Sequence, residues 1–175
     1  MSGMRPEDLL ARIIHGALDT PKPAPHRPQP DADQPTAHWT NPLLLERVAY
    51  LRKMARAGEG FATDTLRDSP GHRTILVTRL RNSPAESFES IAQFLLVLEG
   101  RATLITGGLL DKPRKTAPGH NTGNAITGGD AQELLPGDVL HIAPGVPTEF
   151  HVPNEKPFSC LIVRITVALA CDDRA

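Results

Sequence analysis

Apolar residues recur at helical spacing only in the first third of the chain. Within residues 6–18 they recur at intervals of three and four, as on one face of a helix: Leu10, Ile13, Ile14 and Ala17. This helix is predicted to pack on the body of the same protein or of a second copy, with docking to another partner as the alternative. Residues 19–37 contain six prolines, which disfavour both a helix and an inner strand. We therefore predict that residues 1–38 form a helix and an extended tether.

A second helix is predicted within residues 39–60 and is expected to pack on the domain that follows. Asn41 can cap its first turn, Pro42 suits the first helical position, and Gly58 can end it. Its apolar side chains fall on one face: Leu44, Leu45, Val48, Leu51, Met54 and Ala55.

From about residue 61 the pattern changes to short apolar and β-branched runs separated by glycine and proline turns. This pattern is typical of an antiparallel sandwich or barrel, which we predict over residues 61–170. The expected strands are residues 73–80, 87–98, 102–106, 133–135, 139–142, 148–152 and 158–167. The connection between two of them, residues 107–130, is long, and such loops are usually functional or mobile.

Composition narrows the possible functions. A chain of 175 residues with 39% hydrophobic residues fits one domain with its own core. It has no apolar run of the ~20 residues that a membrane helix needs. The net charge of −1 gives no basic stripe for nucleic acid. Cys160 and Cys171 are the two cysteines, and without a secretory signal we expect reduced thiols in a cytoplasmic protein.

Two stretches of the strand region resemble the motifs of the cupin superfamily. Residues 96–104 are similar to the end of the first motif, with Gly100 at its turn, and residues 136–147 are similar to the second. The family more often has Pro-x-Gly where this chain has Pro144-Gly145. The resemblance covers residues 71–167. It implies an all-β fold, the cupin double-stranded β-helix or jelly-roll barrel, preceded by one or two helices, as in small single-domain cupins.

The metal ligands of the family are missing from the matching positions. Its first motif normally offers His-x-His and then a glutamate, and its second offers a histidine. This chain has Gln93 for the glutamate, Thr148 for the last histidine, and, for the pair, either Ser87 and Glu89 or Glu86 and Phe88. Serine, glutamine and threonine are poor ligands for transition metals. We therefore predict no metal and no other cofactor.

The candidate site follows from strand alternation, because every second side chain of a barrel strand points inward. If Gln93 and Thr148 point inward, Val97 and Phe150 do so too, and Ser87 joins them in one register. These five residues are the predicted substrate-binding residues. They predict a mostly apolar pocket with a few hydrogen-bonding groups, and a filled core without a cavity is the alternative.

Glu89 is the predicted acid–base residue, with Glu86 taking its place in the other register. A carboxylate inside an apolar barrel has its pKa raised toward working pH. His120 in the long loop can serve as a second catalytic residue if the loop folds over the barrel mouth as a lid. The alternatives are a surface glutamate and a solvated histidine. Arginines along the strands are expected on the solvent face, with contact to an anionic substrate as the alternative: Arg79, Arg81 and Arg164.

The first hypothesis is therefore a metal-independent enzyme acting on a small molecule, of the isomerase, cyclase, dehydratase or lyase type. The alternative is a non-catalytic cupin that binds a small ligand or a partner protein. A third is a metal-dependent cupin with displaced ligands such as Glu89, His120 and His151. We expect a homodimer that binds neither nucleic acid nor membranes.

Overall fold

A computed structural model describes residues 35–154 and 156–167. The chain divides into two units, Met1–Asp31 and Ala32–Ala175. The predicted helix at 6–18, most of the proline-rich tether and Cys171 lie outside the described residues. Within those residues, no helix is long and apolar enough to cross a membrane.

Helix α2 (Asn41–Ala57) confirms the predicted second helix, although its cap differs from the expectation. Thr40, not Asn41, is the N-cap residue, and Pro42 lies in the first turn. The helix ends where the N–H of Gly58 donates to the carbonyl of Met54 at 3.0 Å. It packs on β1 (Phe61–Ser69) and β2 (His72–Arg79), where its buried face and two strand residues form one apolar cluster: Leu44, Val48, Leu51, Leu66 and Leu76.

The remaining elements are strands, which pair antiparallel throughout the described residues. After β1 and β2 come β3 (Ala85–Phe88), β4 (Ile91–Glu99), β5 (Ala102–Thr106), β6 (Leu109–Leu110), β7 (Arg114–Ala117), β8 (His120–Gly123), β9 (Ile126–Thr127), β10 (Asp130–Leu134), β11 (Val139–Ile142), β12 (Thr148–His151) and β13 (Phe158–Thr166).

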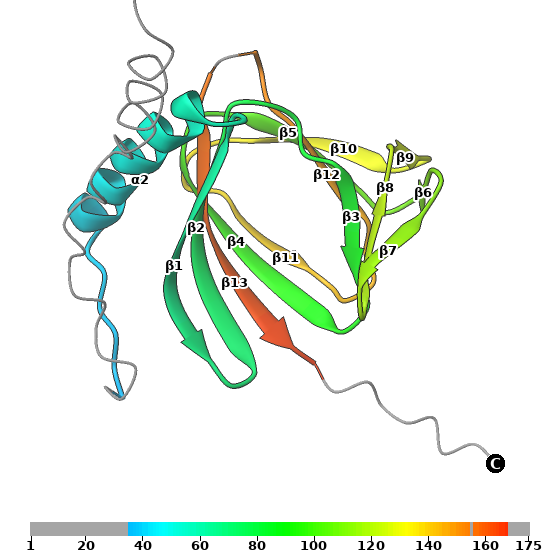
Figure 1. Cartoon of the computed structure of the whole chain (residues 1–175), viewed down its shortest axis with the longest axis horizontal. Helices are drawn as coiled ribbons and strands as arrows, with labels where there is room; N and C mark the ends of the chain where they lie inside the picture. The colour runs from blue at the N-terminus through cyan, green and yellow to red at the C-terminus, as the bar shows by residue number, and fades with distance from the viewer. Residues whose placement is uncertain (1–34, 155, 168–175) are drawn as a thin grey trace, which may run out of the picture. The chain divides into compact units, whose positions relative to one another are not determined.

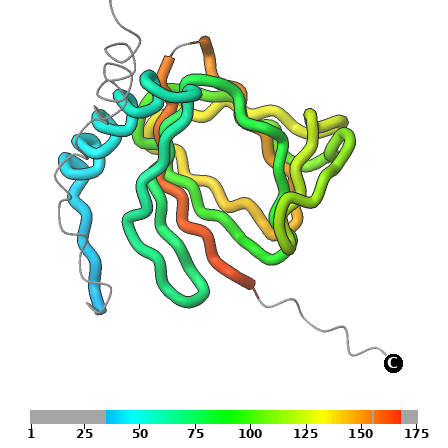
Figure 2. The backbone as a smooth tube through the Cα atoms, in the orientation of Figure 1, coloured from blue at the N-terminus to red at the C-terminus, as the bar shows by residue number. Residues whose placement is uncertain are grey.

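Two sheets face one another around a common interior (Figure 1). One has the order β1-β2-β13-β4-β11 and the other the order β10-β5-β12-β3-β8-β7, while β6 and β9 form a short separate pair. The backbone trace closes into a ring in Figure 2. Alternating residues of both sheets fill part of this interior with one apolar cluster, which includes Leu95, Val97, Leu104, Phe150 and Phe158.

The segment predicted as a single strand at 87–98 is two strands, β3 and β4, separated by a turn at Glu89 and Ser90. This break matters because a shift of one residue moves every side chain of a strand to the opposite face. The predicted long loop at 107–130 is also ordered into strands. Its β8 pairs with β3, so that Glu86 lies opposite Thr122 and Phe88 opposite His120. The connection therefore extends the second sheet.

The turn between β4 and β5 fits tightly against the start of β13. Gly100 has a φ of 80°, which residues with a Cβ rarely adopt. A Cβ at this position would overlap the carbonyl oxygen of Pro157 and lie 3.1 Å from the Cα of Phe158. Glycine at this motif position is thus required both by its backbone conformation and by the close approach of a neighbouring strand.

Candidate functional site

The two sheets enclose a cavity of about 190 Å³. Its apolar lining consists of Phe61, Ile75, Val77, Leu95, Ile142, Phe150 and Ile162. Its polar lining consists of Thr63, Thr65, Arg73, Arg79, Glu86, Gln93, Thr148 and Arg164. An open cavity, rather than the alternative of a filled core, is therefore present. It is more polar than predicted, because three arginines and two further threonines join the expected hydrogen-bonding groups.

The register of β3 brings Glu86, not Glu89, to the cavity wall. Ser87, the next residue, is buried on the opposite face and does not line the cavity. Glu89 follows the last residue of the strand, Phe88, and is exposed. It accepts a hydrogen bond from Nδ2 of Asn121 at 3.0 Å. The register with Ser87 and Glu89 facing inward is therefore wrong and the alternative register with Glu86 facing inward is the one observed, because the strand ends before Glu89.

Three of the predicted substrate-binding residues line the cavity and a fourth does not. Gln93, Thr148 and Phe150 contribute to its wall. Val97 has the same parity as Gln93, but it is 1% exposed and, although a member of the apolar cluster, does not line the cavity. The Thr148 hydroxyl donates to the backbone carbonyl of Glu86 at 3.4 Å, so the site's polar groups on β3 and β12 are directly linked.

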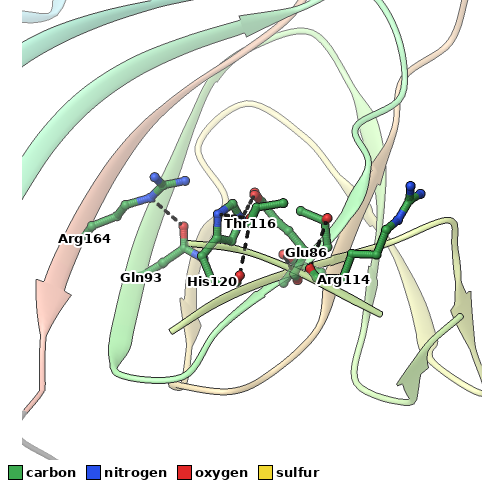
Figure 3. Close-up of polar contacts among 8 residues, drawn as sticks. Glu86, Gln93, Arg114, Thr116, His120 and Arg164 are labelled. Carbon is green, nitrogen blue, oxygen red and sulfur yellow. Dashed lines mark hydrogen bonds and ion pairs between the residues drawn. The ribbon is translucent and has the colours of Figure 1, made fainter. Parts of the chain in front are cut away.

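His120 lies beside Glu86 (Figure 3). Its Nε2 is 3.1 Å from Oε2 of Glu86, and its Nδ1 is 2.9 Å from the hydroxyl of Thr116. The imidazole stacks on the Phe88 ring, with centroids 4.4 Å apart and planes at 8°. The Glu86 and His120 side chains are 20% and 27% exposed. His120 thus reaches the site from β8, a strand of the second sheet between β3 and β7, and not from a lid over the mouth.

Two arginines expected on the solvent face line the cavity instead. Arg79 lies over the ring of Phe61, 4.7 Å from its centroid, and 5.5 Å from that of Phe150. Arg164 lies 4.5 Å from the centroid of Phe88. These contacts hold each guanidinium against aromatic faces, which attract cations.

Burial lowers the pKa of both Arg79 and Arg164, because the charged form loses its hydration, while the nearby carboxylate of Glu86 opposes the shift. Alternation along β2 could have located Arg79, since it shares the parity of Ile75 and Val77, two apolar residues. Arg164 likewise shares the parity of Ile162. Arg81 is exposed, as expected.

The remaining candidate ligands for a displaced metal site are not brought together. His151 hydrogen-bonds Glu149, with Nε2 and Oε1 2.8 Å apart, and does not line the cavity. With Glu86 facing inward, the four positions of the cupin metal site hold Glu86, Phe88, Gln93 and Thr148, which supply one carboxylate and no imidazole. Among residues 35–154 and 156–167, no three histidine, cysteine, aspartate or glutamate side chains gather closely enough to hold a metal ion. This donor set does not fit the transition metal of the cupins.

No protein-family model and no curated protein matches the sequence. Among solved structures, the chain is similar to TT1209 from Thermus thermophilus, with 17% identity and a TM-score of 0.50, over 71% of this chain and 95% of that one. It also matches the cupin domain of Cnp3 from Schizosaccharomyces pombe, with 8% identity, a TM-score of 0.47, and coverage of 62% and 66%.

A third match is HppE in its cobalt(II) form, with 18% identity, a TM-score of 0.45, and coverage of 60% and 53%. The matched region spans less than two thirds of the Cnp3 domain and of HppE. The sheet order shows two antiparallel sheets that face one another as a barrel, and the chain shares this fold with TT1209. The chain therefore has the predicted all-β, jelly-roll type of barrel.

Proposed function

We propose that the chain binds a small organic molecule in the barrel cavity and that Glu86, paired with His120, exchanges a proton with it. One observation carries this proposal: the Glu86 carboxylate lies on the cavity wall within 3.1 Å of the imidazole Nε2 of His120. A carboxylate positioned in this way is a general base in its ionised form and a general acid once protonated. The reaction class is isomerisation, dehydration, cyclisation or elimination.

The neighbours of Glu86 suit proton transfer. Imidazole exchanges protons readily near neutral pH, and His120 is exposed enough to pass a proton between Glu86 and water. Thr116 and the Phe88 ring hold the imidazole in position. A proton taken from the substrate by Glu86 can therefore leave the site through His120, which returns Glu86 to its ionised form.

The size and lining of the cavity restrict the substrate. Its volume of about 190 Å³ is below the roughly 300–1,000 Å³ of sites for drug-sized ligands. The substrate is thus a small metabolite-sized molecule with one apolar side. Gln93 and Thr148 face it with an amide and a hydroxyl. Because the cavity lacks a fitting set of metal ligands, the proposal routes no step through a metal.

A matched pair of variants tests the role of Glu86. Glu86→Gln removes the titratable group inside the cavity, and Glu89→Gln makes the same change on the exposed turn. Incubation in D₂O with a panel of C3–C6 keto and hydroxy compounds, followed by proton NMR, measures exchange at carbons beside a carbonyl. We expect Glu86→Gln to lower the exchange rate by about 10²–10⁴-fold and Glu89→Gln to leave it unchanged.

Two results would contradict the proposal. Unchanged exchange in Glu86→Gln would show that another group moves the proton. If compounds bind to the wild-type cavity but none exchanges a proton, the proposed proton transfer is contradicted and only the proposed binding of a small molecule stands.

A further inference from the structure

Two guanidinium groups face the cavity without a carboxylate partner. Arg79 extends from β2 and Arg164 from β13, and both side chains contribute to the lining. Within the described part of the chain, none of the ion pairs involves either arginine. Glu86, the acidic residue of the lining, is hydrogen-bonded to His120. The third arginine of the lining, Arg73, forms an exposed ion pair with Asp68 at 2.5 Å.

Burying a charge without a directly paired opposite charge is costly, and the carboxylate of Glu86 offsets this cost only in part, because burial still lowers the pKa of both arginines. The aromatic faces beneath Arg79 and Arg164 hold the two guanidiniums in place. Gln93 engages Arg164 at Nε, with its amide oxygen 3.2 Å away (Figure 3). A neutral amide acceptor orients the group without neutralising it, and the terminal nitrogens are left to bind an anion.

The charges of the lining indicate which anion fits. The charge of Arg73 is balanced by Asp68, so Arg79 and Arg164 contribute two positive charges and Glu86 one negative charge, which leaves a net charge of +1. A monoanion balances this charge, whereas the carboxylate of Glu86 would repel a second negative charge on the ligand. The planar fork of a guanidinium matches the two oxygens of a carboxylate, and the apolar half of the lining suits the rest of an organic acid.

We propose that the cavity recognises a small monocarboxylate, whose acid group is held by Arg79 and Arg164. This inference rests on the proposed function of the cavity as a small-molecule site and names its substrate class. In this arrangement the arginines fix the acid group, and Glu86 acts on a carbon further along the same molecule.

The test uses the full chain labelled with ¹⁵N, and proton–nitrogen spectra of the arginine Nε–Hε groups. Propanoate, butanoate and 4-methylpentanoate are titrated beside their primary amides and inorganic phosphate. We expect the three carboxylates to shift the signals of Arg79 and Arg164, which single substitutions assign. Arg79→Met and Arg164→Met should each raise the Kd by about 10- to 100-fold, since a hydrogen bond to a charged group contributes about 1.5–3 kcal/mol.

Control variants separate charge recognition from a general loss of structure. Arg101→Met removes an exposed arginine that pairs with Glu133 at 3.5 Å, and it should leave carboxylate binding unchanged. Arg79→Lys and Arg164→Lys keep the charge without the planar fork, so their Kd should lie between those of the wild type and the methionine variants. Thermal unfolding shows whether each variant is folded.

Each outcome has a defined meaning. If the amides bind as tightly as the acids, or if the methionine variants bind the acids unchanged, the carboxylate proposal is overturned while small-molecule binding stands. Binding of phosphate alone overturns it in favour of an inorganic anion site. If no compound shifts any signal from the cavity, both this inference and the proposed function fail.

Discussion

Replacing Gly100 by alanine tests how tightly the turn between β4 and β5 fits against β13. The φ of 80° at this position costs a residue with a Cβ about 1–2 kcal/mol. The added Cβ also overlaps the Pro157 carbonyl. Relieving this overlap requires a shift of the backbone at Pro157 and therefore of the next residue, Phe158, which is fully buried. Overpacking of this kind costs about 1–3 kcal/mol. The two contributions together lower the free energy of unfolding by about 2–5 kcal/mol.

The chain provides a matched control in Gly71, at the turn between β1 and β2. Its φ is 82°, but an added Cβ there meets nothing within 4 Å. Gly71→Ala should therefore cost only the conformational part, about 1–2 kcal/mol. Urea unfolding followed by circular dichroism measures both variants. Equal losses of stability at Gly100 and Gly71 would refute the reasoning, because they would show that the contact with β13 relaxes without cost.

Deleting residues 1–37 should cost less than about 2 kcal/mol in urea unfolding, because the two apolar clusters of the described residues lie between Leu44 and Ile162. Light scattering at about tens of micromolar should give the mass of a homodimer, since Tyr50 and Met54 of α2 are 44% and 45% exposed; a monomer would contradict this. Burial raises the pKa of Cys160 from 9.0 to about 12. The unfolded thiol ionises first, so stability should fall as pH rises from about 9 to 12, and a Cys160→Ala variant should lose this dependence. Elemental analysis of purified protein should find no stoichiometric iron, manganese, nickel, copper or zinc, and a metal that EDTA removes together with activity would contradict the proposed chemistry.

The barrel could be predicted from the sequence because its turns and its strand pattern are local. Gly100 and the second motif mark hairpins, and short apolar runs between them mark strands. The turn at Glu89 and Ser90 was missed because the flanking residues, from Ser87 onward, also suit a strand. A continuous strand favours the register with Glu89 inside the barrel, whereas the structure has the alternative register, with Glu86 inside.

The site was harder to predict because its contacts are long-range. Glu86 and His120 are 34 residues apart, and their contact depends on a strand pairing that the sequence between them does not specify. Arg79 and Arg164 were placed in solvent because arginine is rarely buried without a partner. Their inward orientation follows from the alternation of side chains along β2 and β13. The prediction gave more weight to the general preference of arginine for exposed positions.

His120 lies on β8, next to the edge strand β7, and this position separates two parts of the site. Arg79, Arg164 and Gln93 belong to the sheet that holds β13 at its centre, whereas β8 and its exposed neighbour β7 lie at the edge of the other sheet. Edge segments tolerate changes in length and sequence, because few core contacts depend on them. The β7–β8 hairpin can therefore be changed to place a different side chain beside Glu86 while the wall formed by β2, β4 and β13 is kept, so the two proposed roles can be altered independently.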